Sequence, residues 1–208
     1  MNGLFFMMLV EQPVIYVLTV LATVFSICVH ECAHSVAALL EGDDTGKRLG
    51  FLSMNPLVVM GWQSLILLLV FGIAYGRVPV NGSRMRHRWS QAWVSFAGPL
   101  SNLLLALLGT FLFGTLFRDS NSWGGMACLQ FAYLNIWLFL FNLLPVPPLD
   151  GWGIVEKFIP KEQWNKISED VRGVLFLSIF MLFMIPGFSH RLSELVMSIV
   201  VRMVELFV

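Results

Sequence analysis

Five apolar stretches fill most of the chain, and short polar segments separate them. They run from Pro13 to Leu40, Leu57 to Tyr75, Gln91 to Phe117, Ala127 to Leu144 and Val171 to Ile185. About 20 apolar residues are enough for a helix to cross the hydrocarbon core of a bilayer. The pattern therefore predicts an all-α polytopic membrane protein, a bundle of about four to six membrane helices in one domain covering residues 1–208.

The interruptions indicate where these helices end. Pro13 suits the first turn of a helix, and Glu41-Gly42-Asp43-Asp44 closes the first stretch. Gly61 and Gly72 break the second stretch. The 45–80 region is therefore open to a re-entrant element or short strands, either of which could hold an extended substrate by β-addition.

The tail from Arg191 to Val208 differs from the other stretches. Its polar residues recur every three or four positions and form a stripe along a helix: Arg191, Glu194, Ser198, Arg202 and Glu205. Such a helix either lies in the membrane interface or packs as a last helix with the stripe facing protein. The pattern is compatible with both arrangements.

Composition supports a membrane setting and excludes other classes. The chain is 57% hydrophobic and 12% charged, and its mean hydropathy of +0.77 lies outside the range of ordinary soluble domains. Thirteen basic and thirteen acidic residues cancel, so no bulk charge favours nucleic-acid binding. Three cysteines without a CxxC spacing are expected to act as small apolar residues, and the N-terminus lacks the basic region of a cleavable signal peptide.

The first apolar stretch contains the motif His30-Glu31-Cys32-Ala33-His34. Its two histidines and its glutamate are the only charged or imidazole side chains between Gln12 and Leu40. Such groups are costly inside a bilayer and persist mainly where function retains them. A spacing of four places both imidazoles on one helix face, where they can reach one cation, while Glu31 is rotated away toward a water. In a soluble protein, such a motif could simply form a solvated helix face, but an apolar membrane helix has no such face. The motif therefore predicts a zinc hydrolase built into a membrane.

A catalytic zinc keeps three protein ligands and one open position, so HExxH leaves one ligand to be found. Asp150 is the only other acidic residue embedded among apolar segments, and it follows a run that contains Pro145, Pro147 and Pro148. These prolines break the helix and let the chain turn a carboxylate inward. On spacing alone, a capping role for Asp150 at the start of the next helix is an equally good explanation.

The chain resembles the site-2 protease family of intramembrane metalloproteases (peptidase family M50), in a small form without a PDZ or CBS module. The resemblance rests on three motifs in order: HECAH at 30–34, Ala97-Gly98-Pro99-Leu100-Ser101-Asn102, and Asn142-Leu143-Leu144-Pro145 leading to Leu149-Asp150-Gly151. They cover nearly the whole chain. Small relatives often carry a His and an Asp after Asn55-Pro56-Leu57, and this chain lacks both. No accessory role of that pair is transferred.

The resemblance implies one Zn²⁺ per chain, held by His30, His34 and Asp150, with Glu31 as the catalytic base. It further implies that Asn142 and Asn102 bind the substrate or stabilise the oxyanion. The motif that contains Asn102 would also pack its helix against the site. The expected partners are a transmembrane protein substrate and the lipid bilayer, with no nucleic acid. The expected location is the cell (inner) membrane of a prokaryote, with the active site toward the cytoplasm.

Loop charge supports this orientation but conflicts with a simple alternation of spans. By the positive-inside rule, the basic segments 77–90 and 150–172 are cytoplasmic and 118–126 lies outside. Strict alternation would make 57–76 a true span and place His30 near the outer face. A zinc shared by His30 and Asp150 instead requires one depth for both residues. We therefore expect 57–76 to dip in and return, or to pack against the bundle.

The resulting hypothesis is an intramembrane zinc endopeptidase that cuts a transmembrane segment of another protein near its cytoplasmic end. Two rivals belong to other classes. A membrane metal transporter or metal-binding protein would need several ligand sets along a path, and the chain offers one. An inactive relative that only binds membrane helices would have lost Glu31 or a ligand, and all are present.

Overall fold

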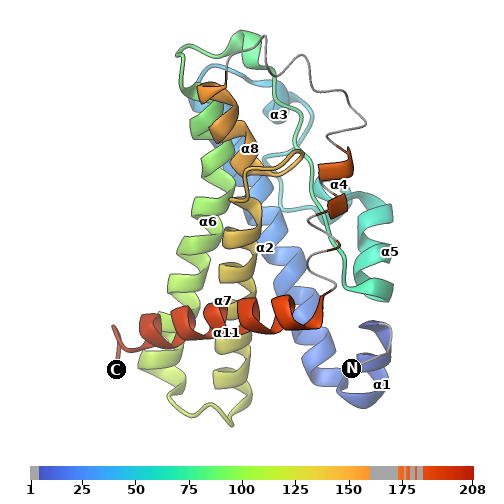
Figure 1. The fold of residues 1–208 in the computed structure, drawn as a ribbon, viewed down its shortest axis with the longest axis vertical. Helices are drawn as coiled ribbons and strands as arrows, with labels where there is room; N and C mark the ends of the chain where they lie inside the picture. Colours follow the sequence, from blue (N-terminus) through green and yellow to red (C-terminus); the bar gives the residue numbers. More distant parts are fainter. Residues whose placement is uncertain (1–4, 160–172, 176, 179–180, 182–184) are drawn as a thin grey trace.

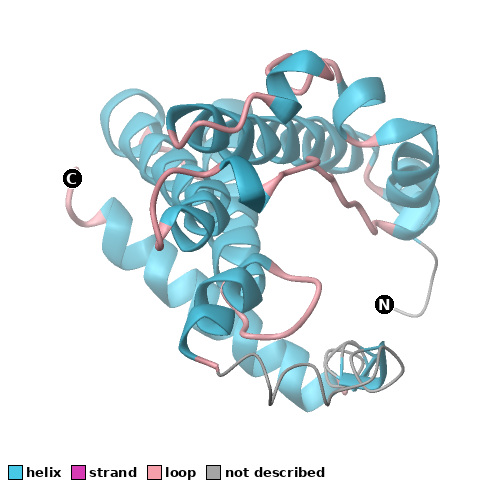
Figure 2. Ribbon diagram, turned by 90° about the horizontal axis from the view of Figure 1, so that it is seen from above, coloured by secondary structure: helices cyan, strands magenta, loops and turns pink. Residues whose placement is uncertain are grey.

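The computed structural model describes residues 5–159, 173–175, 177–178, 181 and 185–208 (Figure 1). Every regular element in that part of the chain is a helix, as the view along the bundle shows (Figure 2). Among the described residues, three helices are long and apolar enough to cross a membrane: α2 (Pro13–Leu40), α6 (Ser90–Leu112, extended by a π-helical turn, Phe113–Phe117) and α7 (Trp123–Asn142). The prediction of an all-α membrane bundle is confirmed.

Short helices connect and cover these three. They are α1 (Met8–Glu11), α3 (Thr45–Arg48), α4 (Pro56–Val59), α5 (Gly61–Phe71) and α8 (Asp150–Val155), with 3₁₀ turns at Phe5–Met7, Gly82–Arg84 and Glu156–Phe158. The predicted fifth stretch, Val171 to Ile185, lies largely outside the described residues.

Helix α6 is the centre of the bundle, because it packs against α2 on one side and against α7 and α8 on the other. Its contact with α2 uses small and branched side chains, Ala37 and Ala38 against Val94 and Ala97. Small side chains let two membrane helices approach closely. The approach brings the backbone of α6 against the face of α2 that carries the two histidines.

The second apolar stretch is not a membrane span. Its long helix, α5, has 11 residues, about 16 Å of helix, whereas the hydrocarbon core is about 30 Å thick. Gly61, the first residue of α5, and Gly72, which follows its last residue, have φ of 74° and 72°, a left-handed conformation that breaks the helix at both ends. The helix packs against α2, where the Tyr16 hydroxyl donates to the Leu69 carbonyl at 2.8 Å.

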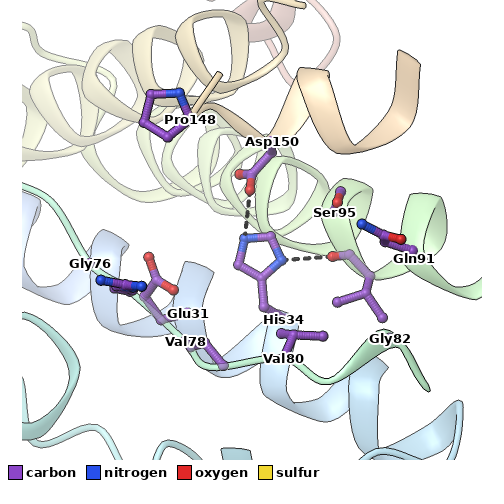
Figure 3. Close-up of a pocket in the computed structure, with 12 residues that line it drawn as sticks. Glu31, His34, Gly76, Val78, Val80, Gly82, Gln91, Ser95, Pro148 and Asp150 are labelled. Atoms are coloured by element: carbon purple, nitrogen blue, oxygen red, sulfur yellow. Dashed lines mark hydrogen bonds and ion pairs between the residues drawn. The ribbon is translucent and has the colours of Figure 1, made fainter. Parts of the chain in front are cut away.

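No strand forms within 45–80, all of which is described. After α5 the chain instead runs as an extended segment, residues 73–81, across the face of α2 that holds the histidines (Figure 3). Hydrogen bonds tie it down: the Ser64 hydroxyl bonds both the N–H and the carbonyl of Tyr75, at 2.9 and 2.7 Å, and Arg77 N–H donates to the Val59 carbonyl at 3.3 Å. We call residues 73–81 the roof segment.

Asp43 anchors the far end of the roof segment. Its carboxylate is fully buried and accepts the N–H of Asn81 at 2.6 Å and the N–H of Thr45 at 3.1 Å. Burial alone would raise the pKa of Asp43, but these hydrogen bonds and that of the Thr45 hydroxyl outweigh it and hold the pKa below its ordinary value. The anchor is therefore ionised at neutral pH, outside the membrane-spanning helices.

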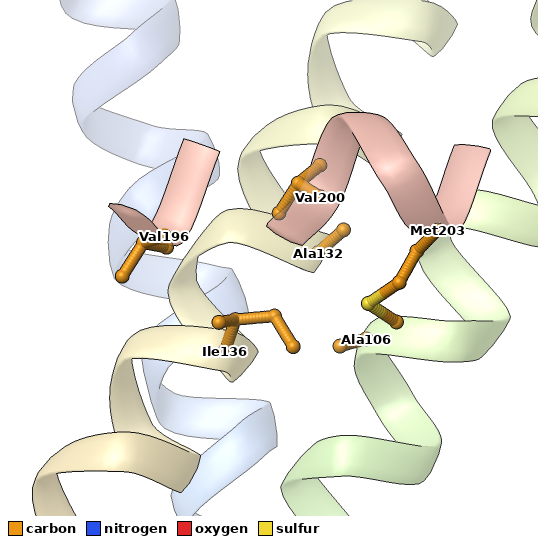
Figure 4. Close-up of a cluster of buried hydrophobic side chains, with 6 residues drawn as sticks. All are labelled: Ala106, Ala132, Ile136, Val196, Val200 and Met203. Atoms are coloured by element: carbon orange, nitrogen blue, oxygen red, sulfur yellow. The ribbon is translucent and has the colours of Figure 1, made fainter. Parts of the chain in front are cut away.

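The tail forms α11 (Pro186–Val204), which crosses α6 and α7 (Figure 1). One face buries Val196, Val200 and Met203 among side chains of α6 and α7 (Figure 4). The predicted polar stripe, including Glu194 and Arg202, lies on the exposed face. The tail thus packs as a helix on the bundle, with its stripe turned away from the protein core.

Candidate metal centre

The two histidines of the HExxH motif lie one turn apart on α2 and point the same way. His30 and His34 are buried, with 6% and 7% of their surface exposed, and their Nε2 atoms lie 3.0 Å apart. This is the helix periodicity expected from the sequence.

Asp150 meets them from the other end of the chain. Its Oδ2 lies 2.9 Å from Nε2 of His30. Its Oδ1 lies 3.2 Å from Nε2 of His34, the contact drawn in Figure 3. The proline-containing turn after α7 carries it there, and Leu149, not Asp150, is the N-cap residue of α8. The capping explanation of Asp150 therefore finds no support in the geometry, and the structure brings the three predicted ligands together.

The ring of His34 is oriented by the backbone of α6. Its Nδ1 lies 2.7 Å from the carbonyl of Val94. A carbonyl only accepts, so Nδ1 carries the proton and Nε2 presents a lone pair.

The donor set fits zinc. In a tetrahedral site with Zn–N and Zn–O bonds of about 2.0–2.1 Å, neighbouring ligand atoms are about 3.3 Å apart. The three ligand atoms here are within 4.8 Å of one another, with the closest approaches at 2.9–3.2 Å. Within the described residues, the buried Oδ2 of Asp150 accepts no hydrogen bond. Imidazole and carboxylate lone pairs that converge at these distances are typical of a zinc site.

A glycine makes room for this convergence. A Cβ placed on Gly98 of α6 would overlap Nε2 of both His30 and His34. Any other residue at this position would push the imidazoles away from Asp150. The glycine of the Ala97–Asn102 motif is thus explained by the close approach of α6 to the metal centre.

Glu31 lies beside the three ligands, on the side covered by the roof segment. Glu31 is 7% exposed, and its carboxylate faces Gly76, where a Cβ would overlap it (Figure 3). Glu31, His34 and Asp150 line one cavity of about 270 Å³, together with Val78 and Val80 of the roof segment. A water or a peptide carbonyl in this cavity would contact the ligands and Glu31 at once.

The two predicted asparagines lie elsewhere. Asn102 is fully buried, does not line the cavity, and places its Oδ1 2.6 Å from Nδ1 of His30. Asn142 ends α7, is half-buried, and donates from Nδ2 to the Leu138 carbonyl at 3.0 Å. Neither side chain reaches the cavity in this conformation.

Two groups next to the candidate metal centre were not predicted from the sequence. The backbone carbonyl of Val94 carries no sequence signal, because any residue supplies a carbonyl. Asn135 does carry one, since it is an amide inside the apolar stretch of α7, and it is fully buried against Asn102. Burying a polar side chain inside the bilayer costs free energy, so an amide at this position indicated a functional or structural role.

Comparison with known proteins places these features in a family. The model of the family described as "Peptidase family M50" matches residues 18–127 and 118–186. The chain is 36% identical over 186 residues to "Putative zinc metalloprotease YwhC" of Bacillus subtilis, covering 83% of each chain. It is 30% identical over 199 residues to "Putative zinc metalloprotease Rip2" of Mycolicibacterium smegmatis, covering 88% of this chain and 72% of the relative.

A more distant match is "Putative zinc metalloprotease MJ0611" of Methanocaldococcus jannaschii, 27% identical over 173 residues, with 82% of this chain and 81% of the relative covered. No solved structure matches the chain. Zinc is the cofactor that these relatives indicate, and the His30, His34 and Asp150 cluster fits it. Together with the three membrane-length helices, the matches show that the chain is an integral membrane member of peptidase family M50, the family of these zinc metalloproteases.

Proposed function

We propose that the protein is an intramembrane zinc endopeptidase that hydrolyses peptide bonds in or near transmembrane segments of other membrane proteins. One observation carries the proposal. A three-ligand cluster with a carboxylate beside it is buried part-way along α2, a helix long enough to span the bilayer. A membrane segment of another protein already lies at that depth, whereas a soluble substrate would have to enter the bilayer region to reach the cluster.

In the proposed reaction, His30, His34 and Asp150 hold the zinc. When bound, zinc polarises the scissile carbonyl and lowers the pKa of a bound water to about 7. Glu31 accepts the proton of the attacking water on its carboxylate as the water adds to the carbonyl carbon. It then gives this proton to the leaving amine as the C–N bond breaks. The roof segment covers Glu31 and limits its contact with bulk solvent.

The two asparagines receive different roles. The amide of Asn102 is fully engaged, with Oδ1 on His30 and Nδ2 on Asn135, so we assign it to holding the ring and not to substrate. Asn142 ends α7, just before the turn that brings in Asp150, and it remains our candidate for contact with the substrate backbone or the oxyanion. That contact requires its Nδ2 to leave the Leu138 carbonyl.

The cytoplasmic orientation is supported by contacts at the end of α2. Arg84 pairs with Asp44 at 2.6 Å, and Arg86 N–H donates to the Glu41 carbonyl at 2.9 Å. The basic loop and the histidine-bearing half of α2 therefore share one side of the bundle. Positive loops favour the cytoplasmic side, so we place the active site toward the cytoplasm.

The roof segment is our candidate for holding the substrate in an extended form, because a helical backbone shields its own carbonyls. The N–H groups of Val78 and Val80 make no hydrogen bond within the described part of the chain. Both residues also line the cavity. Because they are two apart, their backbone groups face one side and can pair with an added strand.

Cysteine crosslinking tests this assignment. We expect Val78→Cys or Val80→Cys to crosslink to a cysteine near the scissile bond of a substrate trapped on the Glu31→Gln variant, as seen by gel shift. Leu21→Cys, on an exposed face of α2, is the matched control and should not crosslink. Crosslinks from position 21 but not from 78 or 80 would exclude the roof segment as the substrate edge.

Metal removal tests the proposed activity itself. The purified protein in liposomes should cleave a co-reconstituted single-span membrane protein, and a chelator should abolish cleavage until Zn²⁺ is restored. Mass spectrometry of the products should place the cut in or next to the span. A metal transporter would instead move Zn²⁺ across the vesicle wall and leave the span intact, which would reject the proposal.

A further inference from the structure

A chain of hydrogen bonds runs from His30 into the interior of the bundle and crosses three helices. Nδ1 of His30 lies 2.6 Å from Oδ1 of Asn102 on α6, and Nδ2 of Asn102 donates to Oδ1 of Asn135 on α7 at 3.0 Å. Nδ2 of Asn135 donates to Oγ of Ser26, back on α2, and to the carbonyl of Phe131, both at 2.9 Å. Ser26, Asn102 and Asn135 are fully buried.

The far end of this chain fixes its direction. The carbonyl of Phe131 can only accept, so Asn135 must turn its NH₂ toward Phe131 and its oxygen toward Asn102. Asn102 must then donate to Asn135 and present its own oxygen to His30. The opposite arrangement would place the oxygen of Asn135 against the Phe131 carbonyl, two acceptors with no proton between them.

The same reasoning determines the tautomer of His30. Facing an amide oxygen, its Nδ1 must carry the proton, which leaves the lone pair on Nε2, the atom that faces Asp150. His34 reaches the same state through the Val94 carbonyl, a backbone group that no substitution removes. Of the two histidines, only His30 depends on side chains for its tautomer. Asn102 contacts its ring, and Asn135 fixes the orientation of Asn102.

We propose that Asn135 is a positioning residue for the zinc centre, which acts through Asn102 to keep Nε2 of His30 free and aimed at the metal. The inference rests on the proposed assignment of His30, His34 and Asp150 as zinc ligands. Partners that orient a metal-bound histidine typically change metal affinity or activity about 10–100-fold when they are removed. The alternative is that Asn135 only joins α7 to α2 and α6 by ordinary interhelical hydrogen bonds.

Zinc affinity of the purified full chain, measured by competition with a chelator, separates the two explanations. Asn135→Leu keeps the branched shape of the side chain but removes both donors and the acceptor, and we expect the Kd for zinc to rise at least about tenfold. The matched control is Gln130→Leu on the same helix, which removes the bond from Gln130 Nε2 to Thr19 Oγ1 at 3.3 Å but has no link to His30. Its zinc Kd should stay at the wild-type value.

A double-mutant cycle tests whether Asn135 acts through Asn102. In an Asn102→Leu background, Asn135→Leu should raise the zinc Kd no further, because the connection to His30 is already cut. The ¹⁵N shifts of the His30 ring in the metal-free protein should report one tautomer in wild type and a mixture in Asn135→Leu, a change that packing alone would not produce. If Asn135→Leu does not fold, Asn135→Ala serves in the same comparisons.

Several results would overturn the inference. These are an unchanged zinc Kd in Asn135→Leu, equal losses in Asn135→Leu and Gln130→Leu, or additive losses in the double variant. If wild type itself binds no zinc, the ligand assignment fails and the inference fails with it. Wild-type binding with an unchanged Asn135→Leu variant would reject the inference alone and leave the proposed function standing.

Discussion

Asp150→Ala should lose zinc almost completely. Of the three proposed ligands, Asp150 is the one that does not come from α2, and its removal leaves two imidazoles that cannot close a catalytic site. Loss of a residue that only orients a ligand costs about 10–100-fold in affinity, so loss of a ligand itself should cost at least about 100-fold. Plasma mass spectrometry of the detergent-purified protein should find about one zinc per chain in wild type and far less in the variant.

Asp119→Ala is the control for this experiment. Asp119 lies in the connection before α7, where its Oδ1 accepts the N–H of Asn121, and it has no contact with the metal cluster. Its zinc content should equal that of wild type. If Asp150→Ala retained full zinc, the third ligand would lie elsewhere, and the meeting of α2 with the turn after α7 would need another explanation.

Glu31→Gln should stop cleavage without removing zinc. The amide keeps the shape of the side chain but cannot accept the proton of the attacking water. General acid–base catalysis contributes about 10²–10⁴-fold, so turnover of a membrane substrate should fall by at least about 100-fold. Zinc content should stay near wild type, because Glu31 is not part of the ligand cluster.

The matched substitution is Glu11→Gln in the exposed α1, which should cleave at the wild-type rate. The pair also separates the rival functions. A helix-binding protein without catalysis would show no cleavage to lose, and a metal carrier would depend on its ligands and not on Glu31. Full cleavage by Glu31→Gln would require another base, and no other acidic side chain except the proposed ligand Asp150 lines the described cavity.

The parts of the site that lie within one helix were predictable from the sequence. A spacing of four fixes the relation between His30 and His34 whatever surrounds α2, since helix geometry is local. Asp150 is different, because its spacing alone was equally consistent with a helix cap. Its contact with the histidines depends on how α6 and α7 pack, and only the resemblance to a family connected residues that far apart.

The roof segment and α11 show why the remainder was not predictable. Gly61 and Gly72 predicted a break in the helix. The extended path of 73–81 depends on the hydrogen bond from the Asn81 N–H to Asp43, a long-range contact that only the folded structure reveals. For α11 the prediction of a polar stripe was correct. The direction in which the stripe faces depends on whether Val196 and Val200 pack against other helices. They do so on α7, and the stripe faces outward.

The depth of the histidines bears on what happens after a cut. Leu40 ends α2 ten residues beyond His30 and six beyond His34, about 9–15 Å of helix, so the cluster lies toward the C-terminal end of this 28-residue helix. A span of about 20 residues that is cut within its length leaves two shorter pieces, and neither can cross the bilayer. Each piece keeps only part of the apolar surface that anchored the intact span. For the proposed reaction, the bilayer itself would then release the products, and the enzyme would need no device to extract them.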